Sequence, residues 1–195
     1  MIWLSSDLHF CHNKDFIYEH RGFHSIQEMD EAIVRNFNEV VAWDDDLYIL
    51  GDIMLNDNDK GIRLLRQLPG NIHILIGNHD TSNRVELYRQ EPRITVEGYA
   101  TVLKYQKYNF YLCHYPTVLK YQKYNFYLCH YPTLTVNLDD DKSLTKRPLC
   151  LAGHTHSTKL FEPCGSYNVA LDAHENYPVA IDQIIYDFKY KEKKK

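Results

Sequence analysis

Residues 72–80 read IHILIGNHD, an apolar run that stops at Gly77 and gives way to three polar residues of the types that bind metal ions. The same transition occurs three more times, because the apolar runs 2–4, 47–50 and 149–152 each lead within a few residues to aspartate or histidine. In open α/β sheets, ligands gather outside the carboxyl ends of the strands. If the four runs are neighbouring strands, their polar residues therefore meet in one site.

The spacing at these strand ends favours pairs of ligands. Side chains two residues apart in an extended segment point to the same side, so Asp7 can act with His9, and His154 with His156. The candidate metal ligands are Asp7, His9, Asp52, Asn78, His154, His156 and one further histidine. This mixture of oxygen and imidazole ligands suits Mn²⁺, Fe²⁺ or Zn²⁺ better than Ca²⁺ or Mg²⁺. We expect two divalent ions, with Mn²⁺ favoured and Fe²⁺, Zn²⁺ or Ni²⁺ as alternatives.

The first half of the chain alternates apolar runs with helical patterns. Ser25 precedes apolar residues at helical spacing, and Glu28 lies three residues further on, which indicates a capped helix that continues to about Ala42. A second helix is predicted over residues 59–68, between the second and third apolar runs. Strands that alternate with helices favour parallel pairing in an α/β sheet.

Beyond Arg93 the sequence changes to short β-prone runs without long helices. The predicted strands are 94–96, two hairpins in an internal repeat, 149–152, 167–171 and 181–188. These runs predict a second sheet packed on the first.

The composition is that of one compact domain. The chain has 195 residues, of which 44% are hydrophobic, so we expect a single domain over residues 1–188 and a basic, disordered tail over 189–195. The formal net charge of −4 offers no broad attraction for nucleic acid or an anionic membrane. The apolar runs are too short for a signal peptide or a membrane span, so we expect a cytoplasmic protein.

An internal repeat interrupts the second half. Residues 101–116 and 117–132 both read TVLKYQKYNFYLCHYP. In each copy, two β-prone runs flank a polar stretch, which predicts a hairpin. The fold needs only one such hairpin, so the other could loop out, extend a sheet edge, or swap into a second molecule and form a homo-oligomer.

Five segments now stand in one order along the chain: Asp7-Leu8-His9, Gly51-Asp52, Gly77-Asn78-His79-Asp80, a His-Tyr-Pro segment and Gly153-His154-Thr155-His156. Together they resemble the calcineurin-like metallophosphoesterase superfamily, over nearly the whole chain. The chain is most similar to its small bacterial and phage phosphoesterases or phosphohydrolases, which end near an Asn-Val-x-x-Asp segment, here residues 168–172. The resemblance implies a four-layer α/β/β/α sandwich of two mixed sheets flanked by helices.

The resemblance also implies a role for each ligand. Asp7, His9 and His156 would hold the first metal ion, Asp52 would bridge, and Asn78, His154 and the His-Tyr-Pro histidine would hold the second. Both His114 and His130 fit that last position, because the repeat duplicates it. We favour His114, since the extra sixteen residues then only lengthen an existing polar loop, at little cost in chain entropy.

The implied activity is hydrolysis of a small phosphate ester, a diester rather than a monoester, by a hydroxide that the two ions supply. His79 would donate a proton to the leaving oxygen, and Asp80 would orient the His79 imidazole. His12 and Asn13 follow the first ligand pair and could contact the substrate phosphate.

Two other functions stay open. The chain could be a catalytically silent scaffold or binding protein on the same fold. It could also be a nuclease for single-stranded nucleic acid, with tyrosines that stack on bases, although the net acidity argues against extended binding. Hydrolysis is favoured because every motif position is filled and His79 is present.

Overall fold

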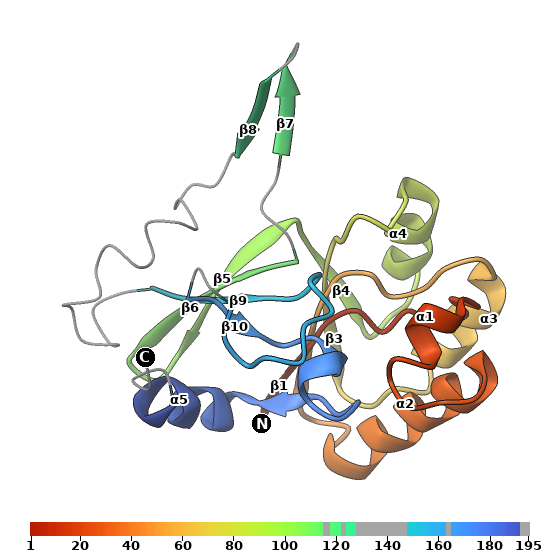
Figure 1. The fold of residues 1–195 in the computed structure, drawn as a ribbon, viewed down its shortest axis with the longest axis horizontal. Coiled ribbons are helices and arrows are strands. Elements are labelled where there is room, and N and C mark those ends of the chain that lie inside the picture. The colour runs from red at the N-terminus through yellow and green to blue at the C-terminus, as the bar shows by residue number, and fades with distance from the viewer. Residues whose placement is uncertain (115–117, 122–123, 128–147, 163–164, 192–195) are drawn as a thin grey trace.

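The computed structural model describes residues 1–114, 118–121, 124–127, 148–162 and 165–191. In chain order the elements are β1 Ile2–Ser5, α1 Asp15–Tyr18, α2 Ile26–Val40, β2 Asp46–Leu50, α3 Asn58–Leu65, β3 Asn71–Leu75, α4 Ser82–Arg89, β4 Ile94–Gly98, β5 Ala100–Tyr105, β6 Tyr108–Cys113, β7 Val118–Tyr121, β8 Tyr124–Tyr127, β9 Pro148–Ala152, β10 Tyr167–Asn168, β11 Val179–Ala180 and α5 Ile181–Tyr190. Figure 1 shows α1 to α4 gathered on one side of the sheets, with α5 on the other side. Among the described helices, none has the length and apolar character that crossing a membrane requires.

The first sheet is the scaffold for most of the predicted ligands. Its strand order is β11-β1-β2-β3-β4, with β1 to β4 parallel and β11 antiparallel to β1. Alternate side chains of a strand point to opposite faces, so Leu47 and Ile49 of β2 pack in the cluster that includes α2 and α3, whereas Leu50 packs toward the second sheet. The parallel pairing predicted from the alternation of strands and helices is confirmed.

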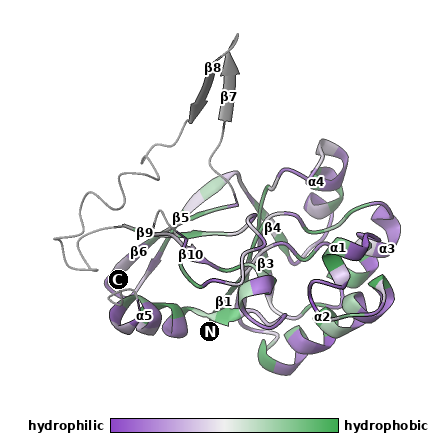
Figure 2. Cartoon of the chain, in the orientation of Figure 1, coloured by the Kyte–Doolittle hydropathy of each residue, from purple (hydrophilic) through white to green (hydrophobic). Residues whose placement is uncertain are grey.

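Helix α2 begins where the sequence predicts. The Ser25 hydroxyl accepts a hydrogen bond from the backbone N–H of Glu28 at 3.1 Å and thereby caps the helix. Met29, Ile33 and Phe37 are fully buried and recur at helical spacing. Figure 2 shows the resulting mixture of hydrophobic and hydrophilic residues along α2.

The second sheet packs against the first and completes the sandwich. Its order is β10-β9-β6-β5, in which β9 is parallel to both β6 and β10, and β5 is antiparallel to β6. Phe110 and Leu112 of β6 and Leu149 and Leu151 of β9 share one buried cluster with Leu4 of β1. The apolar residues of α5 belong to the same cluster. The predicted α/β sandwich of two mixed sheets flanked by helices is therefore confirmed.

Three predicted boundaries differ in the structure. Residues 181–188 form helix α5 rather than a strand, because four buried apolar residues recur at the helical spacing i, i+3, i+4 and i+7. These residues are Ile181, Ile184, Ile185 and Phe188. Strand β4 pairs with β3 at the edge of the first sheet instead of joining the second. Helix α5 continues to Tyr190, so the first two residues of the predicted tail are helical.

Both copies of the repeat contain the predicted hairpin. Leu103 pairs with Phe110 in β5–β6, and sixteen residues later Leu119 pairs with Phe126 in β7–β8, so the register is the same. β6 joins the second sheet through β9, whereas β7 and β8 form a separate two-stranded sheet. In Figure 1 this second hairpin stands away from the two main sheets.

Candidate metal centre

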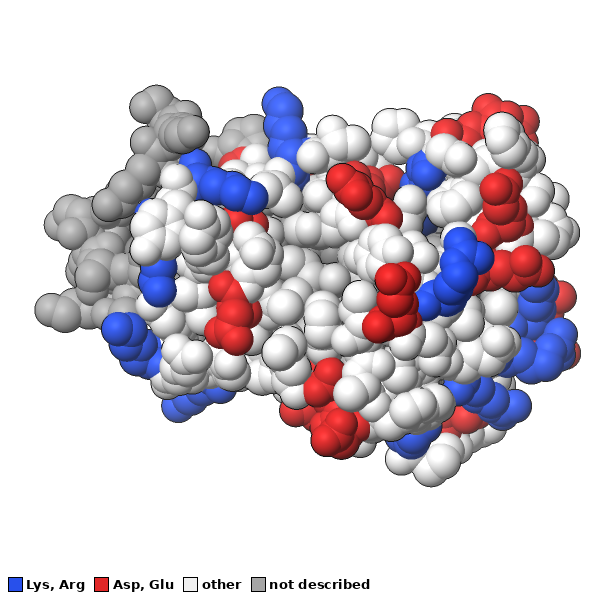
Figure 3. Space-filling view, turned by 90° about the horizontal axis from the view of Figure 1, so that it is seen from below, with Lys and Arg blue, Asp and Glu red and all other residues white. Residues whose placement is uncertain are grey.

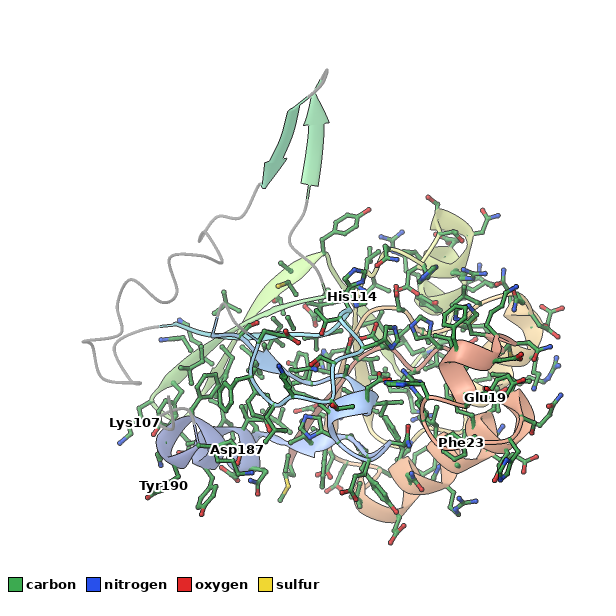
Figure 4. All side chains as sticks on the ribbon, in the orientation of Figure 1. Glu19, Phe23, Lys107, His114, Asp187 and Tyr190 are labelled. Carbon is green, nitrogen blue, oxygen red and sulfur yellow. The ribbon has the colours of Figure 1, made fainter. Side chains whose placement is uncertain are left out.

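The carboxyl ends of five strands converge to form the candidate site. Asp7 and His9 follow β1, Asp52 follows β2, Asn78 and His79 follow β3, His114 follows β6, and His154 and His156 follow β9. Figure 4 shows His114 near the middle of the molecule, with Lys107 at the opposite, outer end of the same hairpin. The structure thus brings together the ligand candidates that the sequence placed at separate strand ends.

The backbone at these turns is strained. Asp7, His9, Asp52, His154 and His156 have φ values of 58°, 52°, 55°, 77° and 50°, a left-handed conformation that residues other than glycine rarely adopt. Each costs roughly 1–2 kcal/mol. Hydrogen bonds between neighbouring loops hold these residues in the left-handed conformation. They include Asp7 N to Gly51 O at 3.1 Å and His9 N to Asp52 O at 3.0 Å. Such strain is typical of functional sites.

Two glycines allow the loops to approach each other. A Cβ atom on Gly153 would collide with the Ser6 hydroxyl and the Asp7 carboxylate, and a Cβ on Gly77 would collide with the Asp52 carboxylate. Only glycine fits where a backbone passes this close to a buried carboxylate. The glycines at these strand ends are therefore part of the site.

The first group of potential ligands consists of Asp7, His9 and His156, whose ligand atoms all lie within 4.8 Å of one another. Asp7 Oδ1 lies 3.7 Å from His9 Nε2 and 3.8 Å from His156 Nε2, and these two nitrogens are 3.1 Å apart. Asp7 Oδ1 is buried and has no hydrogen-bond partner among the described residues. A buried, unpaired carboxylate oxygen is costly, and a cation between these atoms would satisfy it.

The second group consists of Asp52, His114 and His154, again with ligand atoms within 4.8 Å of one another. His114 Nδ1 lies 2.5 Å from Leu50 O, so Nδ1–H donates there and Nε2 is left to face the site. His114 Nε2 lies 3.4 Å from Asp52 Oδ2 and 4.0 Å from Asp7 Oδ1. The two groups therefore adjoin, and together they fit a dinuclear metal site.

Asn78 belongs with the second group, because its Oδ1 lies 3.2 Å from His114 Nε2. An amide oxygen in that position adds a neutral ligand to a carboxylate and two imidazoles. The structure places His114 in the site, while His130 lies outside the described residues. The preference for His114 over His130 accordingly stays a prediction.

The charges of the site are balanced around His114. Burial alone would raise the pKa of Asp7, but neighbouring His9 and His114 hold that pKa well below its usual range. Burial alone would lower the pKa of His114, but Asp52 and Asp7 outweigh burial and raise it to about 9. In the metal-free chain, a proton on His114 thus takes the place that a cation would take between two carboxylates.

A buried ion pair between Arg21 and Asp172 contacts His156 of the first group. His156 Nδ1 lies 3.1 Å from Asp172 Oδ2, and this oxygen lies 3.0 Å from Arg21 Nη2. Arg21 Nη2 also donates a hydrogen bond to the backbone O of Asp7 at 2.7 Å. A carboxylate that accepts from the outer nitrogen of a metal-binding histidine fixes its tautomer and orientation. Neither Asp172 nor Arg21 is among the site residues predicted from the sequence, although Asp172 ends the Asn-Val-x-x-Asp segment.

Asp80 is hydrogen-bonded to backbone groups at two strand ends. Its Oδ2 accepts hydrogen bonds from the backbone N–H groups of Asp52 and Gly77, both at 2.9 Å, and its Oδ1 accepts from the Tyr88 hydroxyl at 2.9 Å. Among the described residues, no hydrogen bond joins these oxygens to the His79 imidazole, and the predicted role of Asp80 in orienting His79 stays a prediction. Asp80 joins the loop after β2 to the loop after β3.

His79 lies at the open side of the site. Its Nε2 is 3.8 Å from Asp52 Oδ2, and its side chain is 40% exposed. His12, predicted as a substrate contact, is buried, and its Nδ1 lies 3.2 Å from His9 Nδ1. His12 therefore contacts His9 at Nδ1, the ring nitrogen opposite the one that faces Asp7 and His156, whereas Asn13, the other predicted contact, is exposed.

Comparison with known proteins supports the fold. No protein-family model matches the chain. The chain is 29% identical over 192 residues to the uncharacterised protein MJ1445 of Methanocaldococcus jannaschii, covering 94% of this chain and 89% of that protein. A solved protein of unknown function, AQ665 from Aquifex aeolicus, matches with a TM-score of 0.68 and 22% identity, over 95% of this chain and 98% of its own. The E. coli phosphoesterase YfcE matches with a TM-score of 0.46 and 16% identity, over 87% and 77% of the two chains. The Aquifex match establishes a shared fold, and the function has to be argued from the residues of the site.

Proposed function

We propose that the chain is a metal-dependent phosphoesterase with two divalent ions, Mn²⁺ favoured, in the two adjoining ligand groups. The observation that carries the proposal is Asp7 Oδ1, a buried carboxylate oxygen with no hydrogen-bond partner in the described part of the chain, which faces three imidazole nitrogens at 3.7, 3.8 and 4.0 Å. Two ions held in this way would neutralise phosphoryl charge and lower the pKa of water, so that hydroxide is supplied near neutral pH.

The residues of the chain divide the remaining tasks. Asp52 is proposed to bridge the two ions, because it belongs to the second group and its backbone O accepts a hydrogen bond from His9 N of the first group at 3.0 Å. His79 is proposed to donate a proton to the leaving oxygen, since it is the partly exposed imidazole beside Asp52. Asn78, at the same turn as His79, is proposed to supply its amide oxygen to the second ion, because that oxygen lies 3.2 Å from His114 Nε2.

The charges around the site favour a diester over a monoester. A phosphate monoester carries up to one more negative charge than a diester and calls for a further cationic partner. Among the described residues, the two arginines next to the site are already engaged. Arg21 pairs with Asp172, and Arg84 donates to His79 O at 2.6 Å and to Asn58 Oδ1 at 2.8 Å. We therefore propose a small phosphodiester as substrate.

The same charge distribution does not favour a nuclease that binds extended nucleic acid. The formal net charge is −4, and on the face shown in Figure 3 the basic and acidic residues among the described positions are interspersed. Binding a polynucleotide backbone normally needs a continuous basic strip. A small ester held by the metal ions does not.

The test is hydrolysis of bis(p-nitrophenyl) phosphate and p-nitrophenyl phosphate by the Mn²⁺-loaded protein, with metal content measured on the same sample. We expect turnover of the diester, loss with a chelator, and recovery with Mn²⁺. His79→Ala should keep the metal and lower kcat by roughly 100-fold to 10,000-fold. His24→Ala, at an exposed histidine away from the strand ends, is the matched control. Full metal content without turnover would contradict the proposal and favour a scaffold.

A further inference from the structure

Phe16 is an exposed aromatic residue on the short helix α1, next to the candidate metal centre. Its side chain is 70% exposed, while the following residue, Ile17, is only 5% exposed and packs in the core beside α2. Ile17 thus anchors the helix and leaves Phe16 turned toward solvent. Single exposed apolar residues are common on proteins, so the position of this one matters more than its exposure.

A series of rings connects Phe16 to the proposed catalytic histidine. The Phe16 ring meets the His12 ring edge to face, with centroids 6.0 Å apart, and the His12 and His79 centroids are also 6.0 Å apart. His79 in turn lies 5.6 Å from the ring of His9, a ligand candidate. Phe16 therefore lies on the His79 side of the centre. This is the side where the leaving group of an ester must lie if His79 protonates it.

The segment between the ligands and Phe16 is held by consecutive hydrogen-bonded turns. His12 N donates to His9 O at 3.0 Å, Lys14 N to His12 O at 2.7 Å, and Ile17 N to Lys14 O at 2.9 Å. These bonds hold the backbone that carries Phe16 in place relative to the ligands, so less backbone freedom is lost when a second ring packs against this side chain. This is the arrangement that a binding contact needs.

We propose that Phe16 stacks on a planar aromatic group of the substrate, so that the preferred esters are aryl or nucleobase-containing phosphodiesters. This inference rests on the proposed function for its location and adds the chemical class of the ester group. Stacking on an aromatic side chain tolerates different rings because every aromatic ring presents a π-face. It would not distinguish one nucleobase from another.

The test uses two diesters that carry the same charge and are similar in size but differ in planarity: methyl phenyl phosphate and methyl cyclohexyl phosphate. Binding of each to the Mn²⁺-loaded protein is measured by calorimetry in wild type, Phe16→Ala, Phe16→Leu and Phe16→Tyr. Wild type should prefer methyl phenyl phosphate by roughly 10-fold, a preference that Phe16→Tyr keeps and that Phe16→Ala and Phe16→Leu lose. Tyr190→Ala, at another exposed aromatic residue, is the control and should keep the preference.

The outcomes separate this inference from the proposed function. If the protein binds methyl phenyl phosphate with the Phe16-dependent preference but hydrolyses no diester, the stacking contact stands and the phosphoesterase proposal fails. If Phe16→Ala weakens both ligands equally, or if the preference survives in Phe16→Leu, the ring does not stack and the inference is wrong. Absence of binding by either ligand would overturn it as well.

Discussion

Residues 101–116 and 117–132 have the same sequence, and both contain an antiparallel hairpin with the same register, yet the two hairpins have different surroundings. In the first copy, β6 pairs with β9, Phe110 and Leu112 are fully buried, and His114 enters the candidate metal centre. In the second copy, β7 and β8 pair with each other and with no other described strand. The local sequence therefore determines that each copy forms a hairpin. The position of the copy in the chain determines which sheet the hairpin joins.

The chain connection explains why the first copy is in the sheet. Only Tyr99 separates β4 from β5, and Gly98 O accepts a hydrogen bond from Ile76 N at 2.7 Å next to the β3 strand end. Seating the second copy instead would require a connection of more than sixteen residues from β4, with a further cost in loop entropy. The two copies can nevertheless be exchanged in principle, because every residue in one has an identical counterpart in the other.

The largest expected difference is in stability. Phe110→Ala removes a fully buried ring from the core between the sheets and should lower the free energy of unfolding by about 3–5 kcal/mol. The matched substitution in the second copy, Phe126→Ala, should cost less than about 0.5 kcal/mol, because β8 joins neither main sheet. Urea unfolding of both variants measures the difference.

A small loss in the free energy of unfolding from Phe110→Ala would contradict the expected difference between the two copies. It would mean that the second hairpin, with its intact phenylalanine, replaces the damaged first one. The double variant Phe110→Ala/Phe126→Ala decides this, since exchange rescues the single variant and cannot rescue the double one.

The next effect concerns the metal. His114→Ala removes a ligand candidate from the second group, so it should lower the metal content and reduce kcat for the diester by at least about 100-fold, roughly 2.7 kcal/mol. His130→Ala should leave both unchanged. Equal losses from the two variants, measured by metal analysis and initial rates, would show that both copies supply the ligand.

The pattern of apolar runs ending in Gly, Asp and His predicted the convergence of the strand ends. Each run and the polar residues that follow it are adjacent in the sequence, so this pattern is visible locally. Roles that depend on distant segments were not predictable. Asp172 meets His156 sixteen residues away and Arg21 151 residues away. Asp80 binds backbone N–H groups, which no side-chain pattern reveals. Residues 181–188 were misread because isoleucine and aromatic residues are β-prone, although their spacing is helical.

A smaller effect is the pH dependence of the metal-free protein. Asp52 and Asp7 raise the pKa of His114 from 6.5 to about 9 against the effect of burial. Because the folded value lies above the unfolded one, protonated His114 stabilises the fold below about pH 6.5, and this contribution is lost as the pH rises to about 9. We expect a loss on the order of 2–3 kcal/mol between these values, measured by denaturation in chelator. His114→Gln should abolish this pH dependence and His130→Gln should retain it; the reverse result would assign the buried histidine to the second copy.

The smallest effect comes from removing one copy of the repeat. Deleting residues 117–132 or residues 101–116 yields the same polypeptide, so this variant has one hairpin, one His-Tyr-Pro segment and no possibility of exchange. The deletion roughly halves the connection between β6 and β9, which should raise the free energy of unfolding by only about 0.6 kcal/mol. Metal content and diester hydrolysis should not change.

If the second hairpin instead pairs with another molecule, size-exclusion chromatography will show an oligomer that becomes a monomer on deletion. A large loss of stability without a change of mass would mean that the second hairpin contributes to the fold of its own chain, and that the difference between the two copies is smaller than their pairing suggests.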